Sequence, residues 1–344
     1  MKKQKIAVAA MSLAATMMLS ACGDGGNIAT PSTGASAPAA MTSNGALEAS
    51  VVAQLNAYRL AMGVGPVAQD EILDTSAQAH SLYLFANFVN GNLPAQTNNE
   101  VSNFANYYEA TPLSRARKAG APATEFIDEV ADVGFTLLNT RTFASDCVTQ
   151  ALSTVYRLQS MTYVQQTIGV GLQQNVSQRT YACVFDFGQS SGVVGSPIAD
   201  GFSPVGGQQI SVDAVAHSPF TNETGVAQGM TRENPNPAPG VSAPGRPIMV
   251  RVTATQAGDI LTVSTFTLTS PSGLVVPTRI IVASAALSGS TGATADVNNM
   301  LEAGVAFLLP LDPLAANTTY TVSFAGARGS TPINATWSFT TAAN

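Results

Sequence analysis

Apolar residues between positions 46 and 158 recur mainly at intervals of three and four, which is the spacing of an amphipathic helix. The clearest stripe runs from Leu47 to Met62 and is interrupted by Gly63. A second stripe contains His80 together with Leu73 and Leu84. The pattern predicts helices over residues 46–63, 69–88, 111–119, 125–138 and 144–158.

The hydrophobic period changes near residue 165. Residues 168–172 and 181–187 read as two strands joined by a polar turn. Helices followed by paired strands are typical of an α+β layer fold, so we assign residues 46–190 to one α+β domain.

Beyond residue 200 the chain is rich in Pro, Thr and Val and shows only short alternating runs. Strands are predicted at residues 248–253, 262–268, 275–282, 305–311, 319–324 and 336–340, with an extended loop at 283–297. This spacing predicts an all-β sandwich over residues 201–344. A Ser- and Gly-rich stretch before it predicts a linker at 191–200.

The N-terminus begins with lysines and continues as an apolar run from Ile6 to Leu19, which is the layout of a secretory signal. The run ends in Leu19-Ser20-Ala21-Cys22, which resembles a bacterial lipobox. The resemblance implies a signal peptide over residues 1–22, cleavage before Cys22 and a diacylglyceryl group on its sulfur; the alternative is an ordinary signal peptide with a chance cysteine. Gly23 replaces the aspartate of the inner-membrane retention signal, which favours the outer membrane or cell surface.

Residues 23–45 are almost entirely small or polar and cannot bury enough apolar surface to offset the entropy of ordering. We expect them to form a disordered tether, so that the membrane is a partner through the lipid anchor. Removing the three lysines of the signal leaves 12 basic against 21 acidic residues, a net charge of −9. This charge excludes the basic surface that nucleic-acid binding requires.

Two cysteines remain besides Cys22, at positions 147 and 183. In an oxidising compartment Cys147 and Cys183 are expected to form a disulfide, worth roughly 3–4 kcal/mol by the chain-entropy model. The alternative is two unpaired thiols. Two cysteines and two distant histidines do not give the spacing of a structural zinc site.

A series of short motifs follows one order along residues 46–190. They are Leu55-Asn56-Ala57-Tyr58-Arg59, Ala77-x-x-His80, Thr111-Pro112, Arg115, Ala119-Gly120, Glu129-Val130, Ser153…Arg157-Leu158, Ile168-Gly169-Val170-Gly171 and Asp186-Phe187-Gly188. The series resembles a bacterial CAP domain, of the superfamily named after cysteine-rich secretory proteins, antigen 5 and pathogenesis-related 1 proteins. The resemblance implies an α-β-α sandwich with a surface cleft.

Many CAP domains line that cleft with two histidines and one or two glutamates that can hold a divalent ion. Here Asn98 and Tyr156 align with the two histidines, Glu129 matches one glutamate, and Glu100 is the candidate second acid. Asn and Tyr are poor replacements for imidazole, so we expect no metal and no other cofactor. His80 is the only histidine of this domain, and its apolar stripe favours a hydrogen-bonded core residue over a base. Glu129 has two interpretations, a cleft residue or part of a solvated acidic helix face.

The C-terminal domain carries a second resemblance. Residues 314–322 resemble the tyrosine corner of immunoglobulin-like domains, in which the hydroxyl of Tyr320 would bond to the upstream backbone. Residues 337–341 resemble the final strand of bacterial immunoglobulin-like domains.

Together these features predict a lipid-anchored cell-envelope protein whose degenerate CAP domain binds a lipid, a glycan or a protein without catalysis. One alternative is an envelope hydrolase or peptidase that uses Glu129 with Glu100 or His80. Another is a purely structural envelope protein whose cleft is filled by its own side chains, such as Tyr156.

Overall fold

The computed structural model describes residues 45–92, 97–135, 143–175, 177–256 and 258–343. The predicted signal peptide, Cys22 and the tether as far as residue 44 lie outside this part of the chain. Within the described residues, no helix is long and apolar enough to cross a membrane.

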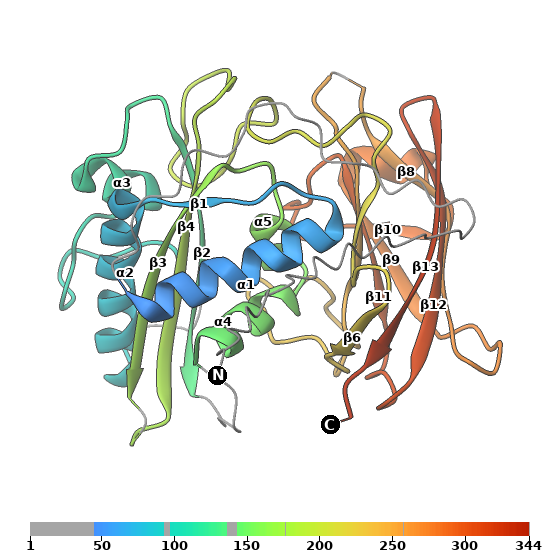
Figure 1. Ribbon diagram of the computed structural model, residues 1–344, viewed down its shortest axis with the longest axis horizontal. Coiled ribbons are helices and arrows are strands. Elements are labelled where there is room, and N and C mark those ends of the chain that lie inside the picture. Colours follow the sequence, from blue (N-terminus) through green and yellow to red (C-terminus); the bar gives the residue numbers. More distant parts are fainter. Residues whose placement is uncertain (1–44, 93–96, 136–142, 176, 257, 344) are drawn as a thin grey trace, which may run out of the picture.

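The described chain is mixed α/β and contains three sheets (Figure 1). The helices are α1 (Ala46–Met62), α2 (Glu71–Val89), α3 (Pro112–Ala119), α4 (Phe143–Leu152), α5 (Tyr156–Met161) and the 3-10 helix η1 (Ser284–Gly289). The first sheet contains, in spatial order, β1 (Ala68–Gln69), β3 (Thr167–Asn175), β4 (Thr180–Gln189) and β2 (Phe126–Phe135).

The other two sheets come from the C-terminal part of the chain. The second sheet has the order β10 (Ala293–Ala295), β9 (Thr278–Val282), β11 (Val305–Pro310), β7 (Ile248–Arg251) and β5 (Ala216–Ser218). The third has the order β6 (Glu223–Val226), β13 (Thr331–Thr341), β12 (Thr319–Arg328) and β8 (Leu261–Thr269). Buried residues of both sheets form one core, so the two sheets lie face to face.

The elements form layers from left to right in Figure 1. Helices α2 and α3 cover one face of the first sheet, and α1, α4 and α5 cover the other. One hydrophobic cluster includes residues of α1, α4, the first sheet and the near face of the second sheet. The middle helices are therefore buried on both sides, and the second and third sheets complete the series.

Helix α2 lies unusually close to the first sheet because β3 carries glycine where the helix crosses it. A Cβ atom added at Gly169 would lie 2.0 Å from the Leu73 carbonyl carbon, and one at Gly171 would lie 2.1 Å from the Ala77 oxygen. Only glycine permits this approach. The contact fixes the height of α2, and therefore of His80, above the sheet.

The helix predicted over residues 125–138 is wrong, because residues 126–135 form strand β2. The sequence predicted a helix because four acidic residues also fit the helical period and resemble an acidic helix face: Glu125, Asp128, Glu129 and Asp132. The strand is covered on both faces, so its apolar residues lack the clean alternation of a half-buried strand. Residues 136–138 lie outside the described part of the chain.

Two further predictions need correction. The helix predicted over 144–158 is divided into α4 and α5, with a break at residues 153–155. The loop predicted at 283–297 contains η1 and β10. The hydrogen bond predicted for Tyr320 is confirmed, since the Ala315 N–H donates to its hydroxyl at 3.0 Å.

Helix α5 connects the N-terminal layers to the C-terminal sheets. The Glu233 carboxylate accepts the backbone N–H groups of Val155, Tyr156 and Arg157 at 2.9, 3.1 and 2.9 Å. These are among the N–H groups that a helix cannot satisfy at its own start. A residue of the C-terminal region thus caps a helix of the N-terminal region.

Candidate functional site

A buried polar cluster lies between α2, α3 and the first sheet. Helix α2 contributes His80, α3 contributes Arg115, β2 contributes Glu129, and the segment before α3 contributes Glu100. The side chains of all four are 0% exposed. Three of the predicted site residues, His80, Glu100 and Glu129, therefore lie together.

Both ring nitrogens of His80 face oxygen atoms. Nδ1 lies 3.0 Å from Glu100 Oε1, and Nε2 lies 2.9 Å from the Thr97 carbonyl oxygen and 3.4 Å from Glu129 Oε1. The Thr97 carbonyl oxygen can only accept a hydrogen bond, so Nε2 carries a proton in this contact. Burial, and then the positive charge of Arg115, lower the pKa of His80 overall, against the opposing contacts with Glu100 and Thr97. Both ring nitrogens are therefore engaged by the protein's own oxygen atoms, and neither is open to a substrate proton.

Arg115 is shared between the two glutamates. Its Nη2 lies 2.7 Å from Glu129 Oε2, and its Nη1 lies 3.8 Å from Glu100 Oε1. Burial alone would lower the pKa of Arg115, but the carboxylates of Glu129, Asp186 and Glu100 raise it overall. The guanidinium is thus a fixed positive charge at the centre of an acidic cluster.

Asp186 lies directly opposite Glu129 in the pairing of β4 with β2 and is completely buried. Burial raises the pKa of both carboxyl groups, and Arg115 lowers it. Their mutual interaction raises the pKa of Glu129 and lowers that of Asp186. Two neighbouring carboxyls without solvent favour one shared proton over two negative charges.

Asn98 is bonded to a segment that crosses the outer edge of β2. Its Nδ2 donates to the Glu129 carbonyl oxygen and to Asp200 Oδ2, both at 2.8 Å. The other oxygen of Asp200 accepts the Glu129 backbone N–H at 3.0 Å. Burial raises the pKa of Asp200, and the two hydrogen bonds lower it. The end of the predicted linker thus lies against the site.

Tyr156, predicted as a cleft residue, is not part of this cluster. It begins α5, and its hydroxyl lies 2.5 Å from Asp296 Oδ1 and 2.8 Å from Asn298 Nδ2 in the C-terminal region. Burial raises its pKa, and Asp296 adds to this. Tyr156 therefore contributes to the contact between the N-terminal layers and the C-terminal sheets.

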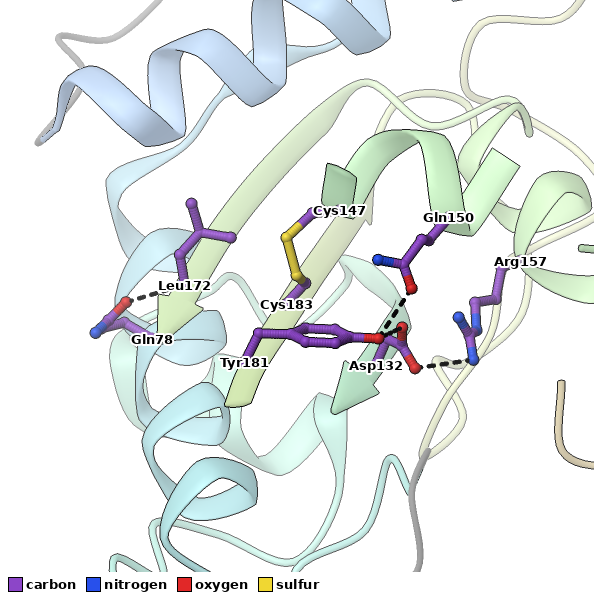
Figure 2. The surroundings of a disulfide bond; sticks show 8 residues. All are labelled: Gln78, Asp132, Cys147, Gln150, Arg157, Leu172, Tyr181 and Cys183. Carbon is purple, nitrogen blue, oxygen red and sulfur yellow. Dashed lines mark hydrogen bonds and ion pairs between the residues drawn. A yellow bond between two sulfur atoms is a disulfide. The ribbon is translucent and has the colours of Figure 1, made fainter. Parts of the chain in front are cut away.

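The predicted disulfide between Cys147 and Cys183 is confirmed (Figure 2). It joins α4 to the central strand β4 over a Cα–Cα distance of 6.0 Å. In the same view, the Tyr181 hydroxyl lies 2.8 Å from Asp132 Oδ2, and Arg157 lies 3.2 Å from the other oxygen of that carboxylate. The covalent bond and this polar network hold the middle helices to the sheet.

Sequence reasoning assigned no site role to three residues, Arg115, Asp186 and Asp200. Arg115 and Asp186 belong to the motifs that carried the resemblance, but motif matching alone did not indicate their proximity. Reading residues 126–135 as a strand with a period of two would have separated Glu129 from Asp128 and Asp132, which lie on the other face. No signal in the sequence pointed to Asp200.

Among the residues that the structure describes, no group of three or more His, Cys, Asp or Glu side chains could hold a metal ion. No model of a known protein family matches this chain. A search of curated proteins also finds no match. The argument about function therefore depends on the geometry of the site and on the sequence.

Proposed function

We propose that this chain is an exported, lipid-anchored cell-envelope protein whose N-terminal part is a degenerate CAP domain that binds a ligand without catalysis. The ligand is a lipid, a glycan or a protein, and the C-terminal part is an immunoglobulin-like sandwich that supports the binding domain. The lipobox-like Leu19-Ser20-Ala21-Cys22 supports the anchor, at the outer membrane or cell surface.

One observation carries the non-catalytic role. Both nitrogens of His80 are occupied, and the four side chains of the cluster are 0% exposed and face one another. General acid-base catalysis needs a group that can exchange a proton with the substrate. In this arrangement the charged groups face one another, and none of the four is open to exchange a proton with a bound substrate.

The hydrolase alternative is supported by a different observation, the 3.4 Å distance between His80 Nε2 and Glu129 Oε1. Catalysis by this pair would require the site to open toward solvent and His80 to lose a partner. Removal of Glu129 would then abolish turnover.

The full chain, purified without chelator, tests the proposal. Native mass spectrometry is expected to show a retained ligand or a bare chain with one disulfide, and assays on peptidoglycan and on peptide substrates are expected to show no turnover. If turnover occurs and Glu129→Gln abolishes it while Glu109→Gln does not, the protein is an enzyme. Labelling with a radioactive fatty acid, compared between the natural chain and Cys22→Ser, tests the anchor.

A further inference from the structure

Residues 199–201, here called the strap, lie along the outer edge of β2, which is the end strand of the first sheet. The Gly201 N–H donates to the Ile127 carbonyl oxygen at 2.7 Å, and the Ala199 carbonyl oxygen accepts the Leu113 N–H at 3.0 Å. Leu113 is in the first turn of α3, where backbone N–H groups have no partner within the helix. Edge strands and helix starts both present unpaired backbone groups to an added peptide.

The Asp200 side chain occupies the centre of this contact. One oxygen accepts from Asn98 Nδ2 at 2.8 Å and the other from the Glu129 N–H at 3.0 Å. Two donors that converge on the two oxygens of one carboxylate recognise an acidic side chain. The backbone contacts on either side fix the direction of the chain.

On its C-terminal side the strap is anchored, since Phe202 stacks on Tyr163 and the buried Ser203 exchanges hydrogen bonds with Gln189. On its N-terminal side it is weakly held. Ile198, which precedes it, is 58% exposed, and Val194 is 59% exposed. Gly195 has a φ of 86° with no atom within 4 Å of its Cβ position, and Gly201 has a φ of 139°. The stretch from Gly195 to Gly201 buries little apolar surface and has a glycine with positive φ at each end, so it can swing away from β2 at low cost while Phe202 stays in place.

We propose that the strap occupies a peptide-binding groove of its own chain, formed by Asn98, the start of α3 and the edge of β2, and that the ligand in trans is an extended peptide with an acidic side chain. This inference depends on the binding role proposed above and names its ligand class as protein. The strap then acts as an internal competitor: a partner peptide must displace Asp200, because both use the same two donors.

The test uses the full chain, its variant Asp200→Ala and a labelled peptide with the sequence of residues 196–203. We expect Asp200→Ala to bind this peptide at least tenfold more tightly than the natural chain does, because its own strap no longer competes. A matched peptide with asparagine in place of the aspartate should bind at least tenfold more weakly, and adding Asn98→Ala to the variant should remove binding. Equal binding of the two peptides, or no gain over the natural chain, would overturn the proposal.

Hydrogen exchange on the natural chain provides a second test, which does not depend on whether a substituted protein folds. The Gly201 amide is expected to exchange at least a hundredfold faster than the amides of β4, because the strap opens locally. Equal protection would show a permanent structural segment and would overturn the proposal. If native mass spectrometry shows a retained ligand but the chain and its variants bind no peptide, this inference alone fails. If the protein shows turnover that Glu129→Gln abolishes, the proposed function itself fails.

Discussion

Arg115 is the residue on which the buried cluster depends. It faces Glu129 at 2.7 Å and Glu100 at 3.8 Å, and Asp186 lies beyond Glu129. A buried ion pair contributes little net stability, but removal of one partner leaves an uncompensated charge without solvent. The cluster is therefore more sensitive to the loss of its cation than to the loss of one of its acids.

Replacement of Arg115 by Met is expected to lower the free energy of unfolding by about 3–5 kcal/mol, because two buried carboxylates lose their positive partner. Urea denaturation at pH 7 measures the effect. Lys118→Met on the same helix is the control, since that side chain is 47% exposed and pairs with Glu109 at 3.7 Å near the surface. A loss below about 1 kcal/mol for Arg115→Met would show that the acids are already neutral in the native state.

Glu125 gives the molecule a defined pH dependence. Burial, and then the charge of Asp70, raise its pKa to about 7 from the ordinary glutamate value of 4.5, against the opposing effects of Thr167 and Arg117. A folded-state pKa above the unfolded value adds stability at pH below about 4.5, and this stability is lost as the pH rises through about 7. Asp74, with a pKa raised to about 6, acts in the same direction at lower pH.

As the pH rises from 6 to 8, the free energy of unfolding of the natural chain should fall because Glu125 loses its proton. In Glu125→Gln this fall should be about 1 kcal/mol smaller. Thermal denaturation at half-unit pH steps measures the difference. Glu109→Gln, at a partly exposed position, should leave the natural pH profile unchanged. Parallel profiles for the natural chain and Glu125→Gln would mean that Glu125 titrates near its ordinary value when folded.

At the scale of elements, the contact of α2 with β3 positions the cluster. Gly169 and Gly171 allow the helix backbone to reach the sheet, and this depth brings His80 to Glu129 on the neighbouring part of the sheet. A side chain at either glycine would require the helix to move, because the atoms that it meets belong to the backbone.

The substitution Gly169→Ala is expected to destabilise the protein by about 3 kcal/mol or more, a cost at the upper end of that for an overpacked core. It should also shift the NMR signals of the His80 ring, because α2 is displaced. Gly134→Ala on β2 is the matched control, since its Cβ would meet the Tyr181 hydroxyl at 3.3 Å, a contact that a small shift relieves. Unfolding curves and the imidazole signals give the two measurements, and unchanged His80 signals in Gly169→Ala would contradict this account.

Most helices and strands could be predicted from the sequence, because their hydrophobic spacing and end residues agree with the positions that they occupy in the fold. Helix α1 ends at Gly63 with a φ of 86°, and α3 begins at a Thr111 capping box followed by proline. Strand β2 was not accessible, since burial on both faces removes the period of two and its acids happen to follow the helical period. The site was predicted in part, since His80, Glu100 and Glu129 were named. Asp200 was not, because it accepts from the Glu129 N–H across 71 residues, a separation that no local pattern spans.

At the scale of the whole molecule, the N-terminal layers and the C-terminal sheets share a hydrophobic cluster and a set of hydrogen bonds. Tyr58 lies 2.6 Å from the Ser218 hydroxyl, Arg251 donates to the Gln159 carbonyl at 2.8 Å, and Glu233 caps α5. Contacts of this kind couple the unfolding of two regions.

Two optical probes separate the regions. The only tryptophan, Trp337, is in β13, whereas the α-helices are in the N-terminal layers. In the natural chain the fluorescence transition and the transition in ellipticity at 222 nm are expected to coincide. In Glu233→Ala the helical transition should move to lower urea ahead of the fluorescence transition, because α5 loses its cap and removal of such a cap costs about 1–2 kcal/mol. Asp312→Ala, at an exposed position of the C-terminal part, should leave the two transitions together, and coincident transitions in Glu233→Ala would show that the cap does not couple the regions.

The cap on α5 also sets an order of events during synthesis. Glu233 follows Val155 by 78 residues, and Asp296, which binds the Tyr156 hydroxyl, follows Tyr156 by 140. The chain is made and exported from its N-terminus, so α5 precedes the groups that complete it. The start of α5 therefore stays uncapped until the segment around Glu233 has folded against it, and the Tyr156 hydroxyl lacks its carboxylate until Asp296 has joined it.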